Sequence, residues 1–173
     1  MKAILMSIRP QYVAKILNGE KTIEIRKKFP KDYVGWVYIY CCKQKKYEIG
    51  CHINYHKVDG KVVARFWCDK VEHIEPRIVE WNMKHQTDTI DQEQLLERSQ
   101  LSLIDLMKYC GGVGYAIHIT KLEIFAKPKE ISEFRTKHYP QYSGMVKNET
   151  HYELVPLTRS PQSFMFIEVW LCH

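Results

Sequence analysis

Four side chains near the start of the chain could act together on a ligand or a substrate. They are the ammonium of Lys21, the hydroxyl of Thr22, the carboxylate of Glu24 and the guanidinium of Arg26. The stretch 21–26 alternates like a β-strand, and strand side chains point to two faces in turn, so the last three groups are expected in one row. Such a row could bind a phosphate, polarise a carbonyl or move a proton, or it could be a solvated, salt-bridged face.

Each group in this row has its own chemical use. Lys21 could contact a phosphate as a point charge, and Arg26 could do so with a two-pronged fork. Glu24 could accept a hydrogen bond from the exocyclic amine of a base, or form an ion pair with Arg26 or Arg9. If Lys21 loses its water on folding, its pKa falls and its amine can act as a base. Lys21 and Glu24 are therefore the candidate catalytic residues if the protein is an enzyme.

Two other polar groups flank the expected strands. Ser7 and Arg9 end a first apolar strand beside the start of a helix, where backbone N–H groups attract anions; simple helix capping is the alternative. A second group leads into the last strand and consists of Arg159, Gln162 and Ser163. It could cover a ligand or bind a base edge, or it could be a turn fixed by Pro161.

The histidines and cysteines do not form a recognisable metal site. Cys51 and His56 are only a loose pair, and the sequence has no C-x-x-C motif. His118 alternates with two isoleucines in an apolar strand, where it could be an acid or a base, or a structural histidine. No phosphate-binding or dinucleotide-binding glycine motif is present, so neither a metal nor a cofactor is expected.

The elements that would hold these groups are strands and short helices. Strands are expected over 3–8, 21–26, 34–41, 62–74, 115–125 and 164–170, with helices over 10–17 and within 91–110. The segment 43–61 suggests a long hairpin, and 135–163 has no sustained period, which is typical of a functional or mobile loop. Because helices are inserted between strands and no linker is visible, the sequence predicts one α+β domain over 1–173.

Positive charge is concentrated in the first part of the chain. The net charge is +6; residues 1–46 hold 11 Lys/Arg and 3 Asp/Glu, a balance of +8, and the remainder holds 15 and 17, a balance of −2. A local positive field suits a polyanion such as nucleic acid, although lysine-rich surfaces also serve solubility. The first apolar run is too short for a signal peptide or a membrane span, so a cytoplasmic location and free thiols are expected.

The N-terminal third resembles the ASCH domain, the activating-signal-cointegrator homology member of the PUA-like superfamily. The resemblance rests on residues 7–10 (SIRP), the short helix through Ile16, and residues 19–26 (GEKTIEIR), which carry the pattern Gly-x-Lys-x-x-Glu-x-Arg. The strand at 114–119 and the segment 156–163 are similar to a subgroup common in bacteria and their phages. The resemblance implies a small mixed PUA-like β-barrel of about six strands, with a short helix after the first strand and helices inserted around 91–110.

The resemblance also implies a ligand, namely RNA, a nucleotide or a modified nucleoside, in a basic cleft beside the first helix and the 21–26 strand. Some small bacterial ASCH proteins are amidohydrolases that deacetylate N4-acetylcytidine with a lysine, a threonine three residues on and a distant glutamate. Lys21 matches the lysine, Glu24 stands at the threonine position, and Glu72 or Glu75 could be the distant glutamate.

We therefore predict a module that binds RNA or a modified nucleoside. The alternative is a hydrolase acting on RNA or nucleosides, either an amidohydrolase or a ribonuclease that uses Lys21. A third hypothesis is a protein-interaction module, with the acidic helical stretch 91–110 as its interface. No membrane partner is expected, and the sequence predicts no particular oligomeric state.

Overall fold

The computed structural model describes residues 1–43, 58–76, 90–139 and 152–169. Contacts between residues divide the chain into two compact units. The first unit comprises Met1–Pro10, Val37–Arg65 and Ile124–His173, and the second comprises Gln11–Trp36 and Phe66–Glu123. Each unit is therefore assembled from separate stretches of the chain, and the expectation of a single domain over 1–173 stays a prediction.

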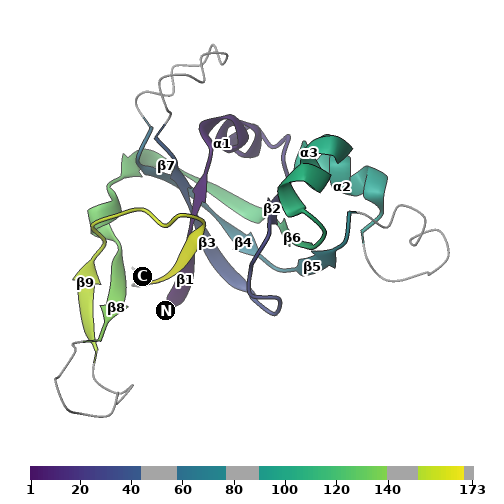
Figure 1. The fold of residues 1–173 in the computed structure, drawn as a ribbon. Helices are drawn as coiled ribbons and strands as arrows, with labels where there is room; N and C mark the ends of the chain where they lie inside the picture. The colour runs from purple at the N-terminus through teal and green to yellow at the C-terminus, as the bar shows by residue number, and fades with distance from the viewer. Residues whose placement is uncertain (44–57, 77–89, 140–151, 170–173) are drawn as a thin grey trace. The chain divides into compact units, whose positions relative to one another are not determined.

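The described residues form a mixed α+β fold, as the sequence predicts (Figure 1). In chain order the elements are β1 (Lys2–Ile8), α1 (Pro10–Leu17), β2 (Ile23–Arg26), β3 (Gly35–Cys41), β4 (Val62–Cys68), β5 (Val71–Ile74), α2 (Gln92–Ser99), α3 (Leu103–Cys110), β6 (Gly114–His118), β7 (Thr120–Lys129), the 3-10 turn η2 (Ile131–Glu133), β8 (Arg135–His138), β9 (Glu153–Pro156) and β10 (Phe164–Glu168). The described residues form ten strands rather than about six, and these strands form two sheets rather than a closed barrel. They pair as a seven-stranded sheet in the order β7-β4-β3-β1-β10-β8-β9 and a three-stranded sheet in the order β2-β6-β5.

The first unit is built around β1. This strand pairs in parallel with β3 and antiparallel with β10, and β10 continues through β8 to β9. Six of the seven residues of β1 are buried because the strand lies between two neighbours and carries apolar side chains on both faces. Ile4, Ile39 and Ile167 are among the fully buried side chains of this unit.

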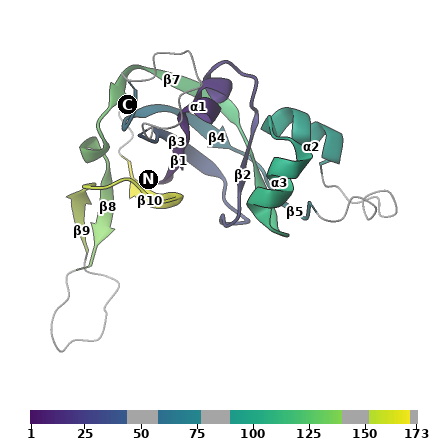
Figure 2. The ribbon, with the colours of Figure 1, turned by 45° about the horizontal axis from the view of Figure 1, so that its top comes forward.

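The second unit holds the three-stranded sheet and the helices α2 and α3. Ile23 and Ile25 of β2 pack with Leu95 of α2 and Leu106 of α3 in one apolar cluster. Figure 2 shows both helices close to β2, in agreement with that cluster. The structure confirms the predictions that Ile23 and Ile25 face a core and that helices lie within 91–110.

Several predicted elements differ from those in the structure. The expected strand 62–74 is two strands, β4 and β5, which belong to different sheets, and 115–125 is divided between β6 and β7. The segment 135–163, expected to be a loop, contains β8 and β9. Most of the hairpin expected over 43–61 lies outside the described residues.

No helix in the described part of the chain is both long enough and apolar enough to cross a membrane. Among the described residues, the buried Cys41, Cys68 and Cys110 are free thiols, as expected. Burial raises the pKa of both Cys41 and Cys68 to about 12, so neither thiol is activated as a nucleophile.

Candidate functional site

The approach of the chain to β2 is held by two helices of the second unit. Helix α1 ends at Leu17, and Gly19 takes the left-handed conformation (φ 78°) that lets the chain turn back. The Lys21 N–H then donates to Lys15 O at 3.0 Å, and the Thr22 N–H donates to Arg98 O at 2.9 Å. These bonds fix where the side chains of residues 21 and 22 leave the backbone.

Strand β2 places two of its charged side chains on one face of the three-stranded sheet. Glu24 lies opposite Ile117 and Arg26 lies opposite Tyr115 in the antiparallel ladder with β6. The alternate residues, Ile23 and Ile25, face the helices on the other side. All four residues of β2 are buried, so its polar face is not solvated.

Lys21, Glu24 and Arg26 form a continuous buried ionic row, here called the β2 charge row. Lys21 Nζ lies 3.3 Å from Glu24 Oε2, and Arg26 Nη2 lies 3.0 Å from Glu24 Oε1. The three residues are only 2%, 6% and 7% exposed. Lys21 Nζ also donates to Ser99 O at 2.6 Å and lies 5.3 Å from the ring centre of Tyr12.

The surroundings of Lys21 change its acid–base behaviour. Burial is the largest effect and lowers the pKa of its ammonium below the ordinary 10.5, because a low-dielectric environment disfavours charge. The Glu24 carboxylate opposes this shift by stabilising the ammonium. Arg26 and Lys15 add to the lowering by repulsion. Lys21 is therefore easier to deprotonate than a lysine in water.

The opposite face of the same sheet carries a second polar group, here called the Glu72 network. The Glu72 carboxylate bonds His118 Nε2, and it also pairs with Lys70 Nζ at 2.9 Å. The Ile90 N–H donates to the same carboxylate at 3.0 Å. Burial acts to raise the pKa of Glu72, but the hydrogen bonds and positive charge of Lys70 and His118 outweigh it and hold the pKa below 4.5.

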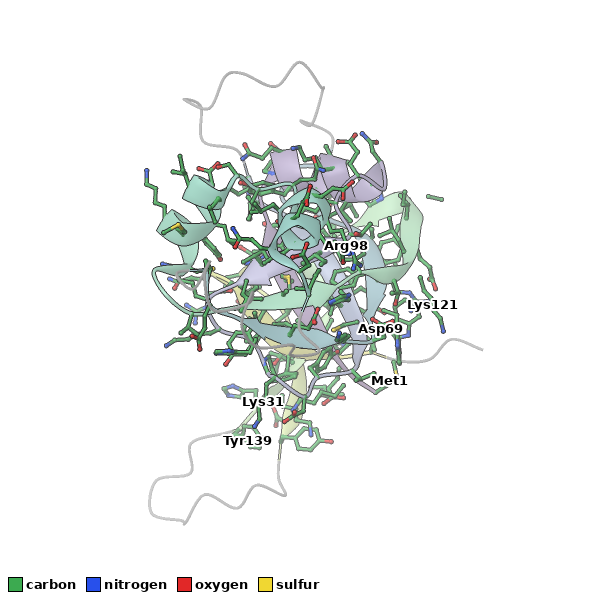
Figure 3. All side chains as sticks on the ribbon, turned by 90° about the vertical axis from the view of Figure 1, so that its right-hand side faces the viewer. Met1, Lys31, Asp69, Arg98, Lys121 and Tyr139 are labelled. Atoms are coloured by element: carbon green, nitrogen blue, oxygen red, sulfur yellow. The ribbon has the colours of Figure 1, made fainter. Side chains whose placement is uncertain are left out.

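Arg98 on α2, labelled in Figure 3, joins this network to the start of β2. Its Nε donates to Thr22 Oγ1 at 3.1 Å, and its Nη2 lies 3.5 Å from His118 Nδ1. The prediction that Thr22 shares a row with Glu24 and Arg26 is therefore wrong. Thr22 lies one residue before β2 begins, and its hydroxyl turns to α2 instead.

The other predicted site residues belong to the first unit. The Ser7 N–H donates to Ser163 O at 2.9 Å and Ser7 Oγ donates to Pro161 O at 2.6 Å, which ties the 161–163 segment to β1. Arg9, Arg159 and Gln162 are exposed. These bonds fit the turn fixed by Pro161, and a role of these residues in ligand binding stays a prediction.

Long-range partners are the part of the site that the sequence analysis missed. Ser99 O lies 78 positions from Lys21, and Arg98 lies 76 positions from Thr22. His118 is a candidate only because it alternates with isoleucines, and Glu72 only because the family resemblance implies a distant glutamate; neither feature shows which residues pair. Among the described residues, no group of three or more His, Cys, Asp or Glu side chains could hold a metal ion.

The fold of the described residues is similar to that of solved ASCH structures. The solved structure of ASCH from Zymomonas mobilis has a TM-score of 0.52 and 13% identity with this chain, over 96% of this chain and 87% of that one. A serine-to-alanine variant of that protein has a TM-score of 0.51 and 12% identity, over 96% of this chain and 88% of that one. The sequence matches no protein-family model and no functionally curated protein. At such identities the likeness shows the fold alone.

Proposed function

We propose that this protein is an RNA-binding domain that holds one nucleoside in a basic cleft at the β2 charge row. The carrying observation is that Glu24 and Arg26 on one sheet face are linked to Lys21, which precedes the strand, and that all three are nearly fully buried. Burying charges costs several kcal/mol for each ion, and a linked, desolvated group of this kind is a recurrent feature of functional sites. The ASCH-like fold is consistent with an RNA ligand.

The degree of burial favours a base over a stretch of phosphate backbone as the group that meets this row. The Glu24 carboxylate can accept a hydrogen bond from an exocyclic amine, and the two cations beside it can donate hydrogen bonds to a nearby carbonyl. Glu24 would accept a hydrogen bond from the amine, while Lys21 and Arg26 would donate hydrogen bonds to the carbonyl. Cytidine presents both groups on its Watson–Crick edge, with the N4 amine and the O2 carbonyl on either side of N3.

Phosphate contacts would come from exposed lysines that follow the strand. Lys27 and Lys28 are exposed directly after β2, and residues 1–46 carry the local balance of +8. Their ammonium groups would act as mobile point charges on the backbone of the bound strand. The buried row would therefore recognise the base, and the exposed lysines would supply the part of the affinity that depends on salt.

RNA binding by the wild-type protein and two variants tests this proposal. With a fluorescent single-stranded oligonucleotide, Lys27→Ala should reduce the slope of log affinity against log salt by about 0.7, the contribution of one phosphate contact. Arg26→Lys keeps the charge but loses the guanidinium fork, so the dissociation constant should rise about tenfold with an unchanged salt slope. Anisotropy titrations at several salt concentrations measure both quantities.

Lys127→Ala is the matched control, because Lys127 is an exposed lysine of the first unit. It should leave both affinity and slope near wild type. Wild-type affinity in both Arg26→Lys and Lys27→Ala would contradict this placement of the ligand. Separate Arg9→Ala and Arg159→Ala variants test the remaining predicted ligand contacts.

The lowered pKa of Lys21 favours a second candidate function, hydrolysis of an acylated nucleoside. In its neutral form Lys21 would take a proton from water as the water oxygen attacks the amide carbonyl. The resulting ammonium would return a proton to the departing amine, which releases a carboxylic acid and the free nucleoside. Between the two proton transfers, the Glu24 carboxylate would stabilise the Lys21 ammonium through their ion pair.

Hydrolysis of N4-acetylcytidine, followed by mass spectrometry, tests this candidate. Lys21→Met removes the amine and leaves Glu24 paired with Arg26, so the fold should persist while turnover is lost. Circular dichroism checks that the variant is folded. Absence of product with concentrated wild-type enzyme, or equal turnover in Lys21→Met, would rule the hydrolase role out for this substrate.

A further inference from the structure

An aromatic and cationic surface of the first unit lies on strands β1, β8 and β10 and just beyond the paired ends of β8 and β9. We call it the stacking surface, and its members are Lys2, Lys137, Tyr139, Tyr152 and Phe166. The three aromatic residues are 50%, 44% and 37% exposed in chain order. Tyr139 is labelled in Figure 3, and Figure 1 shows β8 and β9 side by side. None of these residues belongs to the β2 charge row.

The sheet register brings these side chains together. Strand β8 pairs with β9 through His138 opposite Glu153, so Tyr139 and Tyr152 follow directly at the end of the ladder. Their ring centres lie 6.1 Å apart with the ring planes at 59°. Strand β8 also pairs with β10, through Arg135 opposite Glu168. Alternate residues of paired strands share a face, which places Lys137 and Phe166 on the same side.

Cations accompany two of the rings. Lys137 Nζ lies 4.0 Å from the ring centre of Tyr152, and Lys2 Nζ lies 3.8 Å from that of Phe166. The acidic residue beside them is Glu168, which lies 3.7 Å from Lys137 Nζ and 3.9 Å from the N-terminal amine. This carboxylate is thus offset by neighbouring cations, and the aromatic rings lie in a locally positive environment.

We propose that this surface binds single-stranded RNA by stacking bases on Tyr139, Tyr152 and Phe166. The proposal rests on the proposed function, because it takes RNA to be the ligand, and it adds a second contact region in the other unit. Every base has a π-face, so exposed rings stack on bases without regard to sequence. Charge complementarity supports this occupant, since the ammonium groups of Lys2 and Lys137 can move from the rings to phosphates.

The number and placement of the rings argue for a ligand. Single exposed apolar residues are normal on a protein surface, but a cluster of exposed rings with lysines is the arrangement used for single strands. On β10 the next residue, Ile167, is 1% exposed, so the outward position of Phe166 follows from strand alternation and places its ring on the surface. Neither phosphate contacts alone nor burial in the core accounts for three rings at these positions.

Binding of a labelled oligoadenylate of about 12 nucleotides tests the proposal. Tyr139→Ala and Tyr152→Ala should each raise the dissociation constant about 5- to 150-fold, the effect of losing one stacked base, and the double variant should raise it further. The double variant Tyr139→Phe, Tyr152→Phe keeps the rings and should bind like wild type. An abasic oligonucleotide of equal length keeps the phosphates, so the alanine and wild-type proteins should bind it equally.

Ile104→Ala is the control outside this surface. Ile104 is an exposed apolar residue of the second unit, 76% accessible, so its replacement should leave binding of the oligoadenylate near wild type. Crosslinking with an iodouridine-containing strand, followed by peptide mapping, should mark Tyr139 or Tyr152.

Three distinguishable results would contradict the proposal that RNA bases stack on this surface. If the alanine double variant binds as tightly as wild type while Lys27→Ala still weakens binding, the surface is wrong and the proposed function stands. If wild type binds no RNA at all, both proposals fail. If the alanine substitutions instead abolish self-association, measured by sedimentation of the wild-type chain, the surface is a contact between copies.

Discussion

At the scale of single residues, the Glu72 network and the β2 charge row lie on opposite faces of one small sheet. The Glu72 carboxylate receives Lys70, His118 and the Ile90 N–H, so its lone pairs are occupied by partners from three segments. Buried charges that are fully hydrogen-bonded stabilise a particular arrangement of the chain. The Glu72 network is therefore best explained as structural, which leaves the β2 charge row as the candidate for ligand chemistry.

Replacing Glu72 with glutamine should make the free energy of unfolding less dependent on pH in the acidic range. The folded-state pKa of Glu72 is lowered, so its contribution is fully present above the unfolded value near 4.5 and is lost as the pH falls through the folded value. We expect Glu72→Gln to cost about 1–3 kcal/mol of unfolding free energy at pH 7, because a bond to a charged group is lost. The cost should shrink as the pH falls below 4.5, as measured by urea unfolding at several pH values.

Glu75→Gln is the matched control for this prediction. Glu75 is exposed and lies 3.8 Å from His73, also exposed, so the pair contributes little in solvent. Its unfolding free energy should stay close to that of wild type at pH 7. A Glu72→Gln deficit that stayed constant from neutral to acidic pH would show that the lost stability comes from packing and not from the charge.

At the scale of elements, local signals in the sequence are enough to locate the helices. Pro10 begins α1 and the left-handed Gly19 follows its end. Ser102 Oγ accepts from the Asp105 N–H at 3.1 Å at the start of α3, and Gly111 ends that helix with φ 67°. Capping and termination depend on residues within one turn, so they can be read without knowledge of the tertiary structure.

The breaks between strands could not be predicted in this way. The apolar alternation continues from β4 into β5 and from β6 into β7, although each pair of strands belongs to different sheets. Which sheet a strand joins depends on distant partners. The same reason hides the close approach of α3 to β6, where a Cβ on Gly114 would meet Cys110 Sγ at 2.7 Å.

The residues of the site show the same difference between local signals and contacts distant in sequence. The alternation of β2 correctly places Glu24 and Arg26 together, because both lie inside the strand. Lys21 joins them from outside the strand, positioned by its bond to Ser99 O, which no local spacing indicates. Thr22 is lost from the row because the strand begins one residue later than the pattern suggests.

At the scale of the whole molecule, the two compact units are linked by shared strands. Strands β3, β4 and β7 each have residues in both units. Each unit has its own fully buried apolar side chains, such as Ile167 in the first and Leu106 in the second. When one of these strands unfolds in one unit, its remaining residues in the other unit lose part of their hydrogen bonding. The two units should therefore unfold together.

We therefore predict a single cooperative unfolding transition for the chain. Scanning calorimetry should give a calorimetric enthalpy equal to the van't Hoff enthalpy, as for a two-state domain. Ile167→Ala and Leu106→Ala each remove a fully buried side chain and should each cost about 2–5 kcal/mol. Because the transition is shared, either substitution should lower the melting temperature of the whole protein, and hydrogen exchange should accelerate in both units. Two separate transitions, with each substitution shifting only the one that contains it, would show instead that the chain folds as two independent domains.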